Sequence, residues 1–243
     1  MKKTQLAFKR YEQKYLLESE AFERFRREID RYIVPDEYFK STVCSVYYDT
    51  KDYTLIRNST DAPIYKAKLR LRSYNVPEEE DTVFVELKEK LLGLVYKRRV
   101  AMSVRQATDY VSGRCPAPTD DQMTREIDWF LRTNPVEAKL YLASDREAYD
   151  ARENTELRIT FDENLRWRET ELDLMCGSHG EALTEPGFVL MEIKIPGSAP
   201  MWLARLLSEL EIFPTGFSKY GTCYRDELFR PELFRAGETN TME

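Results

Sequence analysis

Residues 66–72 read Lys66-Ala-Lys68-Leu-Arg70-Leu-Arg72, so bases alternate strictly with small or apolar residues. Successive side chains of a β-strand point to opposite faces, and the stretch therefore predicts a strand that carries four bases on one face. Like charges in such a row repel one another unless anions or acidic partners lie beside them. The stretch thus predicts a strand and also a concentration of positive charge that needs a counter-charge.

The same alternation returns in five further segments. Together the six charged faces hold eleven bases (Arg10, Lys14, Lys66, Lys68, Arg70, Arg72, Lys88, Lys97, Arg99, Arg158 and Lys194) and three acids (Glu12, Glu86 and Glu192). The whole chain of 243 residues has 37 Lys and Arg against 43 Asp and Glu, a net charge of −6, so the rest of the chain is strongly acidic. Solvent-facing surfaces normally mix the two signs.

This segregation of charge favours a closed barrel over a two-sided sheet with a solvated charged face. We expect an α+β fold, mainly antiparallel, in which eight strands close into a barrel with a basic lumen and helices cover the apolar outer faces. The strand pattern falls on residues 8–17, 41–49, 65–74, 82–90, 94–102, 138–149, 156–162, 165–169 and 188–195. The helical pattern falls on residues 19–33, 103–112, 120–132, 202–210 and 218–229. One domain is expected over residues 1–235, with a disordered tail at 236–243.

The composition excludes several classes of function. His179 is the only histidine and lies in a Gly/Ser turn, which argues against a Ser–His–Asp triad and excludes a His-rich zinc site. The four cysteines form no C-x-x-C pair and indicate reduced thiols. No apolar run reaches the length of a membrane helix, so a cytoplasmic location is expected. The acidic net charge and the lack of an aromatic-rich binding sheet argue against nucleic acid as a partner.

Phosphate is the ligand that this charge pattern favours. Arg binds phosphate oxygens through bidentate forks and Lys binds them as a point charge. No Gly-rich phosphate loop is present, so side chains must hold the phosphates. Divalent cations bound with phosphates use one or two protein carboxylates, and Glu192, two residues before Lys194, is the strongest candidate metal ligand.

Six segments carry a resemblance to a known family. They are Arg10-Tyr-Glu-Gln-Lys14-Tyr, Lys68-Leu-Arg70-Leu-Arg72, Phe84-Val-Glu86-Leu-Lys88, Leu157-Arg158-Ile-Thr-Phe-Asp162, Met191-Glu192-Ile-Lys194 and Phe217-Ser218-Lys219-Tyr220. In this order they resemble the polyphosphate polymerase domain of the vacuolar transporter chaperone family. That family belongs to the triphosphate tunnel metalloenzymes, whose antiparallel barrel threads phosphate chains through a basic tunnel. The resemblance runs from about Ala7 to Phe229.

The resemblance implies transfer of the γ-phosphate of ATP onto a polyphosphate chain, with Mn²⁺ or Mg²⁺ as the cofactor. Lys14, Arg70, Arg72 and Arg158 would hold the triphosphate, and Glu192 would anchor the metal; these five are the implied catalytic residues. Further phosphate-binding positions are implied at Arg10, Lys68, Lys88, Lys97, Arg99, Lys194 and Lys219, with Lys88, Lys97 and Lys219 guiding the acceptor. One more tunnel arginine should follow Asp162. Arg166 and Arg168 compete for that place, and Arg168 is preferred.

One departure from the superfamily bears on the reaction. Hydrolytic members carry an E-x-E-x-K strand, but its first position here is Arg10. The change removes one metal carboxylate and adds a cation, which favours the polymerase over the first alternative, a triphosphatase. The second alternative is a non-catalytic polyphosphate-binding module, and the presence of Glu192 with the full set of Arg and Lys argues against it. ATP and polyphosphate or pyrophosphate are the expected partners. Export of a polymer would need a separate membrane partner.

Overall fold

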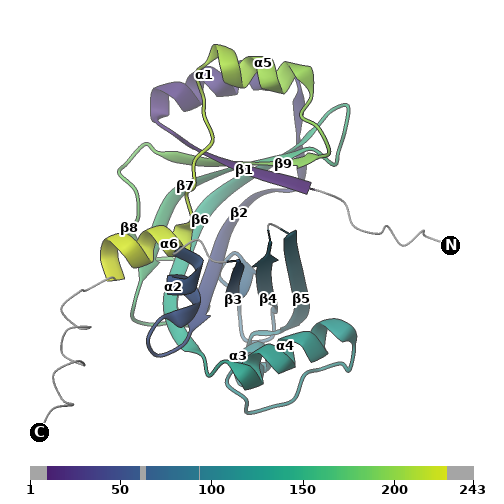
Figure 1. Ribbon diagram of the computed structural model, residues 1–243. Helices are drawn as coiled ribbons and strands as arrows, with labels where there is room; N and C mark the ends of the chain where they lie inside the picture. Colours follow the sequence, from purple (N-terminus) through teal and green to yellow (C-terminus); the bar gives the residue numbers. More distant parts are fainter. Residues whose placement is uncertain (1–9, 61–63, 93, 229–243) are drawn as a thin grey trace, which may run out of the picture.

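The computed structural model describes residues 10–60, 64–92 and 94–228. Eight strands follow one another through hydrogen-bonded antiparallel pairs in the order β1-β9-β7-β6-β2-β3-β4-β5, and a short β8 pairs with β7 (Figure 1). Their bounds are β1 Arg10–Leu17, β2 Ile33–Asp49, β3 Tyr65–Tyr74, β4 Thr82–Leu91, β5 Leu94–Ser103, β6 Glu137–Ala151, β7 Arg158–Arg168, β8 Glu181–Ala182 and β9 Val189–Pro196.

Helices cover this sheet at its two ends and along one side. They are α1 Ser19–Ile29, α2 Thr54–Thr60, α3 Val104–Val111, α4 Gln122–Thr133, α5 Met201–Glu209 and α6 Lys219–Cys223, which continues into the π-helical turn η1 Tyr224–Leu228. The pair α1 and α5 lies over β1 and β9, whereas α3 and α4 lie at the opposite end, beside β3, β4 and β5 (Figure 1). The fold is α+β and mainly antiparallel, as the sequence predicts.

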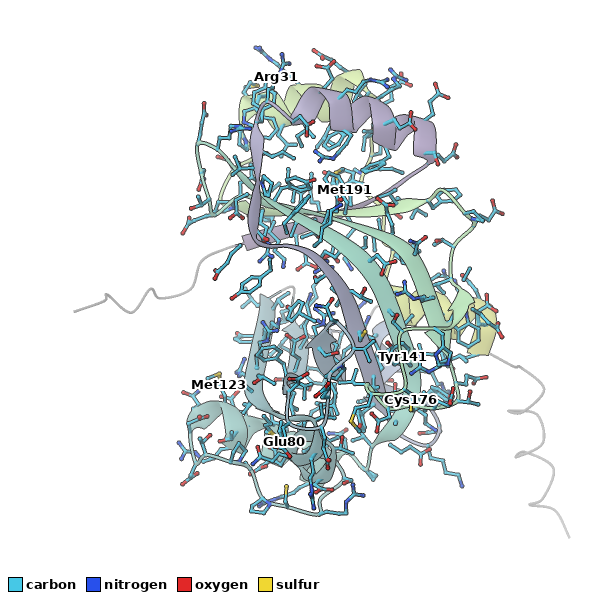
Figure 2. The ribbon with its side chains drawn as sticks, turned by 180° about the vertical axis from the view of Figure 1, so that it is seen from behind. Arg31, Glu80, Met123, Tyr141, Cys176 and Met191 are labelled. Atoms are coloured by element: carbon cyan, nitrogen blue, oxygen red, sulfur yellow. The ribbon has the colours of Figure 1, made fainter. Side chains whose placement is uncertain are left out.

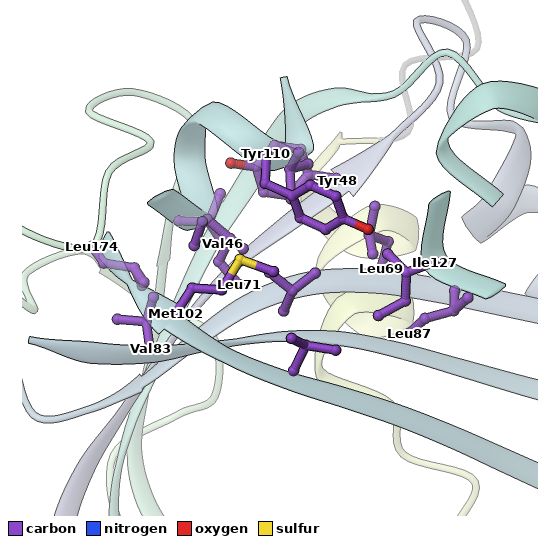
Figure 3. Packing of buried hydrophobic residues seen from close by; sticks show 14 of the residues in the cluster. Val46, Tyr48, Leu69, Leu71, Val83, Leu87, Met102, Tyr110, Ile127 and Leu174 are labelled. Atoms are coloured by element: carbon purple, nitrogen blue, oxygen red, sulfur yellow. The ribbon is translucent and has the colours of Figure 1, made fainter. Parts of the chain in front are cut away.

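The apolar faces of the strands turn toward these helices. Ala67, Leu69 and Leu71 of β3 are buried in one cluster with residues of α3 and α4, among them Ile127 (Figure 3). At the other end Met191 of β9 lies between the sheet and the helix pair α1 and α5 (Figure 2). The charged residues of the same strands therefore point to the concave face of the sheet, which is the arrangement that the alternation predicts.

The sheet is strongly curved, but the described residues form no backbone ladder between its edge strands β1 and β5. Backbone hydrogen bonds among the described residues therefore do not close the sheet into the expected barrel. An ion pair bridges toward the opposite edge instead, since Nζ of Lys88 on β4 lies 3.6 Å from a carboxylate oxygen of Glu12 on β1. Side chains, rather than main-chain hydrogen bonds, connect the two halves at this seam.

Several boundaries differ from those that the sequence predicts. The strands expected at 156–162 and 165–169 form the single strand β7, and the helix expected at 218–229 is the short α6 followed by η1. The helix expected to run to residue 33 ends at Ile29, and β2 begins at Ile33 and passes through Pro35. A register shift between Pro35 and Lys40 accommodates the proline, which cannot donate a ladder hydrogen bond. The predicted tail at 236–243 lies outside the described residues. Within the described ranges, no helix is long and apolar enough to cross a membrane.

Candidate functional site

One buried carboxylate gathers four cations on the concave side of β3, β4 and β5. Cross-strand register places Glu86 between Arg70 and Arg99. Four cations lie near the Glu86 carboxylate. The distances to it are 2.6 Å from Arg70, 2.6 Å from Lys97, 3.2 Å from Arg99 and 3.9 Å from Arg72. We call these five residues the Glu86 network.

The cations keep Glu86 ionised although its side chain is only 1% exposed. Burial would raise the pKa of its carboxyl group, but Arg70, Arg72 and Lys97 together hold that pKa well below its ordinary value. Arg99 is further held in place, because its guanidinium lies 3.6 Å from the centre of the Phe84 ring. The network is therefore a fixed array of charge.

A second network joins two carboxylates to three cations on the other half of the concave face. Lys14 pairs with Glu192 across β1 and β9, with 3.0 Å between Nζ and the carboxylate. Arg146 on β6 donates twice to Asp162, both at 2.6 Å, and lies 3.8 Å from Glu192. Lys219, the first residue of α6, donates to Asp162 at 2.7 Å. We call these residues the Asp162–Glu192 network.

The charges of the second network stabilise one another in the same way. Burial raises the pKa of both carboxyl groups, but Arg146 and Lys219 beside Asp162, and Lys14 and Arg146 beside Glu192, lower them overall. Burial lowers the pKa of Lys219 despite its carboxylate neighbours. Asp162 and Glu192 are thus anionic acceptors that are already engaged by cations.

Positive charge exceeds negative charge in the two networks together, with seven cations on three carboxylates. Two more lysines join this face. Lys68 donates to the Ser218 hydroxyl at 2.7 Å, and burial lowers its pKa to about 8. Burial likewise lowers the pKa of Lys194. A partly buried excess of cations is unfavourable by itself, so this face is suited to an extended anion.

Aromatic side chains line the concave face next to the Glu86 network. Tyr47 stacks on Tyr220 of α6 with ring centres 4.8 Å apart, and Trp167 belongs to the same buried cluster. The Tyr47 hydroxyl accepts a hydrogen bond from Arg70 at 2.9 Å. Burial raises the pKa of Tyr47, but Arg70, Arg72 and Lys68 outweigh it and bring the pKa to about 7. Helix α6 thus bounds the charged region with an apolar wall.

Three phosphate-binding residues implied by the resemblance do not belong to the two networks. Arg158 shares the concave face at the start of β7 and pairs with Asp36 of β2. Lys88 pairs with Glu12 at the seam. Arg10 begins β1, and its side chain lies outside the described part of the chain.

The preferred tunnel arginine, Arg168, is placed on the outer side of the sheet. Its guanidinium lies 3.5 Å from the centre of the Tyr141 ring, and it donates to main-chain carbonyls of residues 171, 173, 177 and 179. That loop carries Cys176 and lies beside Tyr141 (Figure 2). Arg166, the competing residue, instead binds Asp145 and Ser178. Neither arginine reaches the concave face.

A β-bulge explains this displacement. Opposite the single residue between Ala143 and Asp145 on β6, strand β7 has two residues, and Asn164 adopts a left-handed backbone with φ of 49°. The extra residue exchanges the two faces of the strand beyond Asp162. Trp167 therefore faces inward, which is the orientation that strict alternation from Asp162 predicts for Arg166 and Arg168.

Sequence reasoning missed Arg146, which contacts both carboxylates of the second network. Its neighbours Asp145 and Glu147 are also charged, so residues 144–148 show no apolar face and no parity signal. It counted Glu86 among the acids of the charged faces without predicting that four cations share it, and it assigned no role to Asp162. Sharing of these carboxylates by several cations depends on long-range pairing, which local alternation does not reveal.

Glu192 is the one metal ligand that the sequence predicts, and its surroundings limit the kind of metal site that it can form. No group of three or more His, Cys, Asp or Glu side chains suited to a metal occurs among the described residues. A divalent cation held by one carboxylate and by phosphate oxygens of a substrate remains compatible with this donor set. In that case the cation would share Glu192 with Lys14, which contacts it at 3.0 Å.

Comparison with known proteins places the chain in a family. The profile of the VTC domain matches residues 9–226. No curated protein matches the chain in sequence. A Bacillus halodurans structure described as a candidate adenylate cyclase shares 15% identity, with a TM-score of 0.55 over 85% of this chain and 92% of that one. This likeness shows the fold alone.

Two further solved structures are similar at lower scores. A protein from Pyrococcus horikoshii OT3 has a TM-score of 0.48 at 14% identity and covers 90% of this chain and 99% of its own. A candidate adenylate cyclase from Vibrio parahaemolyticus has a TM-score of 0.46 at 12% identity and covers 90% of this chain and 98% of its own.

Proposed function

The chain belongs to the VTC domain family, whose profile spans residues 9–226, and from this premise we propose that it is a nucleotide-dependent polyphosphate polymerase. The concave face binds ATP together with a pyrophosphate or polyphosphate acceptor. The γ-phosphate passes to the acceptor, so the products are ADP and a polymer one phosphate longer.

The observation that carries this proposal is the unbalanced charge of the concave face. Seven cations contact only three carboxylates, and each of those carboxylates is at most 12% exposed. Because the cations come from β1, β3, β5, β6 and α6, the excess charge is spread over the face rather than gathered at one point. A linear phosphate chain matches such an extended array better than a single small anion does.

The proposed reaction needs no nucleophile from the protein. A terminal oxygen of the acceptor attacks the γ-phosphorus, and the bond from that phosphorus to the oxygen bridging it to the β-phosphate breaks as ADP leaves. Negative charge spreads over the equatorial oxygens in the transition state, so catalysis consists of positioning and electrostatic stabilisation. Arg70, Arg72, Arg158 and Lys14 hold the triphosphate, while Lys88, Lys97 and Lys219 orient the acceptor.

A divalent cation, Mn²⁺ or Mg²⁺, is part of the proposal. When bound, it would neutralise charge on the phosphate oxygens, with Glu192 as its protein ligand. Lys14 and Arg146 meanwhile fix the orientation of the Glu192 carboxylate, since both lie within 3.8 Å of it.

Product analysis tests the reaction. The full chain is incubated with labelled ATP, pyrophosphate and Mn²⁺, and the products are separated by chain length. We expect ADP and phosphate chains longer than triphosphate to accumulate together. Orthophosphate without polymer would assign a triphosphatase instead, and binding of polyphosphate without turnover would assign a non-catalytic module.

A further inference from the structure

The turn between β4 and β5 exposes an unusually apolar tip. Leu92 is 75% exposed and Leu94 is 55% exposed, in contrast to the buried apolar residues farther along the same strands. The backbone N–H of Leu92 donates to the carbonyl of Ile64 at 3.0 Å, which ties the start of β3 to the turn. The exposed apolar residues that we call the hairpin tip are Ile64, Tyr65, Leu91, Leu92, Leu94, Val95 and Tyr96.

The strand registers arrange this region in successive layers. Leu92 lies at the turn, followed by the pair Leu91 and Leu94, then Lys90 with Val95, then Glu89 with Tyr96, and then Lys88 with Lys97. On β3, Tyr65, Lys66 and Lys68 stand in the second, third and fifth layers. Leucines and Tyr65 thus come first. Lys66 and Lys90 follow about 7 Å behind the turn at the rise of a strand, and Lys88 and Lys97 follow at about 13 Å.

This gradient matches the profile of a lipid surface. Leucine and valine partition into acyl chains, tyrosine prefers the level of the headgroups, and lysine extends its charge to anionic headgroups from slightly deeper positions. Protein interfaces show a different composition, because their cores favour aromatic residues, Met and Arg and are depleted in Lys. We propose that the hairpin tip docks the protein on a membrane surface that contains anionic lipids.

The local charge supports an anionic surface. Residues 88–99 hold five bases and one acid in a chain whose net charge is −6. Four of these bases pair with Glu12, Glu86 or Glu126, which leaves Lys90. Lys90 is exposed and forms no ion pair with any described residue, while the acid, Glu89, accepts a hydrogen bond from Tyr65. Each base near such a surface adds to the attraction, whereas the acidic remainder of the chain is repelled. Docking would therefore occur tip first, and it does not depend on the reaction proposed above.

Vesicle co-sedimentation of the full chain tests this proposal. The vesicles contain phosphatidylcholine alone or mixed with phosphatidylglycerol. We expect binding to the anionic vesicles, weaker binding at high salt, and an affinity at least about tenfold lower for Leu92→Asp, because a charge replaces the most exposed leucine. The substitution suits the site, since Leu92 has φ of 49° and Asp tolerates that conformation.

Matched variants separate the tip from general effects. Met201→Asp changes a side chain that is 67% exposed on α5, a helix that covers β1 and β9 and does not belong to the hairpin tip, and should leave binding unchanged (Figure 1). Lys90→Glu should weaken binding to anionic vesicles only. Tripolyphosphate at constant ionic strength should not displace the vesicles, because it would occupy the concave face rather than the tip.

Two results would overturn the proposal. The first is equal binding of wild type and Leu92→Asp, or release by tripolyphosphate, which would assign vesicle binding to the concave cations. The second is a lack of vesicle binding together with a dimer in sedimentation velocity that Leu92→Asp dissociates. That result would assign the tip to a second copy of this chain.

Discussion

The Glu86 network and the Asp162–Glu192 network use the same residue types but balance their charges differently. In the first, four cations share one carboxylate, and in the second, three cations share two. The first retains most of the positive charge, whereas the second is nearly neutral and contains two carboxylates. The excess of positive charge on the concave face therefore lies mainly against β3, β4 and β5, whereas the carboxylates lie mainly against β7 and β9.

The two networks also arise in different ways. Three neighbouring strands in register build the Glu86 network, since Arg70, Glu86 and Arg99 are directly opposite one another. The other network combines residues of β1, β6, β7, β9 and α6. The two networks also influence each other electrostatically. Burial lowers the pKa of Arg72 most, and the charges of Arg70 and of Arg146, a member of the second network, lower it further. The predictions below test whether their roles differ as their charges do.

The largest effect is expected from Glu192→Gln. The variant keeps the shape of the side chain but loses its charge, so turnover should fall by at least about a hundredfold while polyphosphate affinity is unchanged or higher. Steady-state rates with ATP and Mn²⁺ and a separate binding titration measure the two effects. Glu12→Gln, whose carboxylate contacts only Lys88 among the ion pairs, is the matched control. Full turnover in Glu192→Gln would contradict the proposed division of roles.

Glu86→Gln should reduce stability rather than turnover alone. Removal of the shared anion leaves four cations without their partner, and we expect the free energy of unfolding to fall by about 2 kcal/mol, because the cations keep some solvent exposure. Chemical denaturation with and without tripolyphosphate measures it, and the added anion should restore more stability to the variant than to wild type.

A surface pair gives the control for this loss of stability. Glu79 lies 3.7 Å from Arg105 with both side chains exposed, so Glu79→Gln should change stability by less than about 1 kcal/mol. Equal losses in the two variants would show that Glu86 does not organise its cations.

Arg72→Gln should weaken polyphosphate binding by about tenfold, the usual effect of losing a charge-assisted hydrogen bond. Arg72 stands 3.9 Å from Glu86 and is the member of that network least engaged by the carboxylate. Arg168→Gln is the comparison, since that arginine binds loop carbonyls on the outer face; it should affect stability but not affinity. Titration calorimetry decides between them, and equal losses of affinity would place Arg168 on the ligand path.

The smallest effect concerns pH. Lys68 has a pKa of about 8 and loses its charge as pH rises, whereas Tyr47 has a pKa of about 7 and gains a negative charge over an overlapping range. Both changes disfavour an anionic ligand, so polyphosphate affinity should fall severalfold between about pH 7 and pH 9. Tyr47→Phe should remove the lower part of the fall and Lys68→Arg the upper part. A pH-independent affinity in wild type would contradict both assignments.

Local alternation predicted much of the fold because it reports which face of a strand is apolar. Ala67, Leu69 and Leu71 are buried beside α3 and α4, and the bases between them face the concave side. The same signal failed beyond Asp162, where a bulge exchanged the faces of β7 and turned Arg166 and Arg168 outward. Alternation gave no signal at Arg146, because residues 144, 145 and 147 are all polar or charged.

Residue types at short spacing were enough to predict most of the strands, the separation of apolar and charged faces and the family. The three-dimensional arrangement was needed to show that the described residues form no ladder between β1 and β5, that Glu86 serves four cations, and that Arg146 joins Asp162 to Glu192. The first and third features depend on segments that are far apart in the chain, and the Glu86 network depends on the register of three consecutive strands. Charge balance on the concave face is therefore a property of strand pairing, because pairing determines how many cations each carboxylate neutralises.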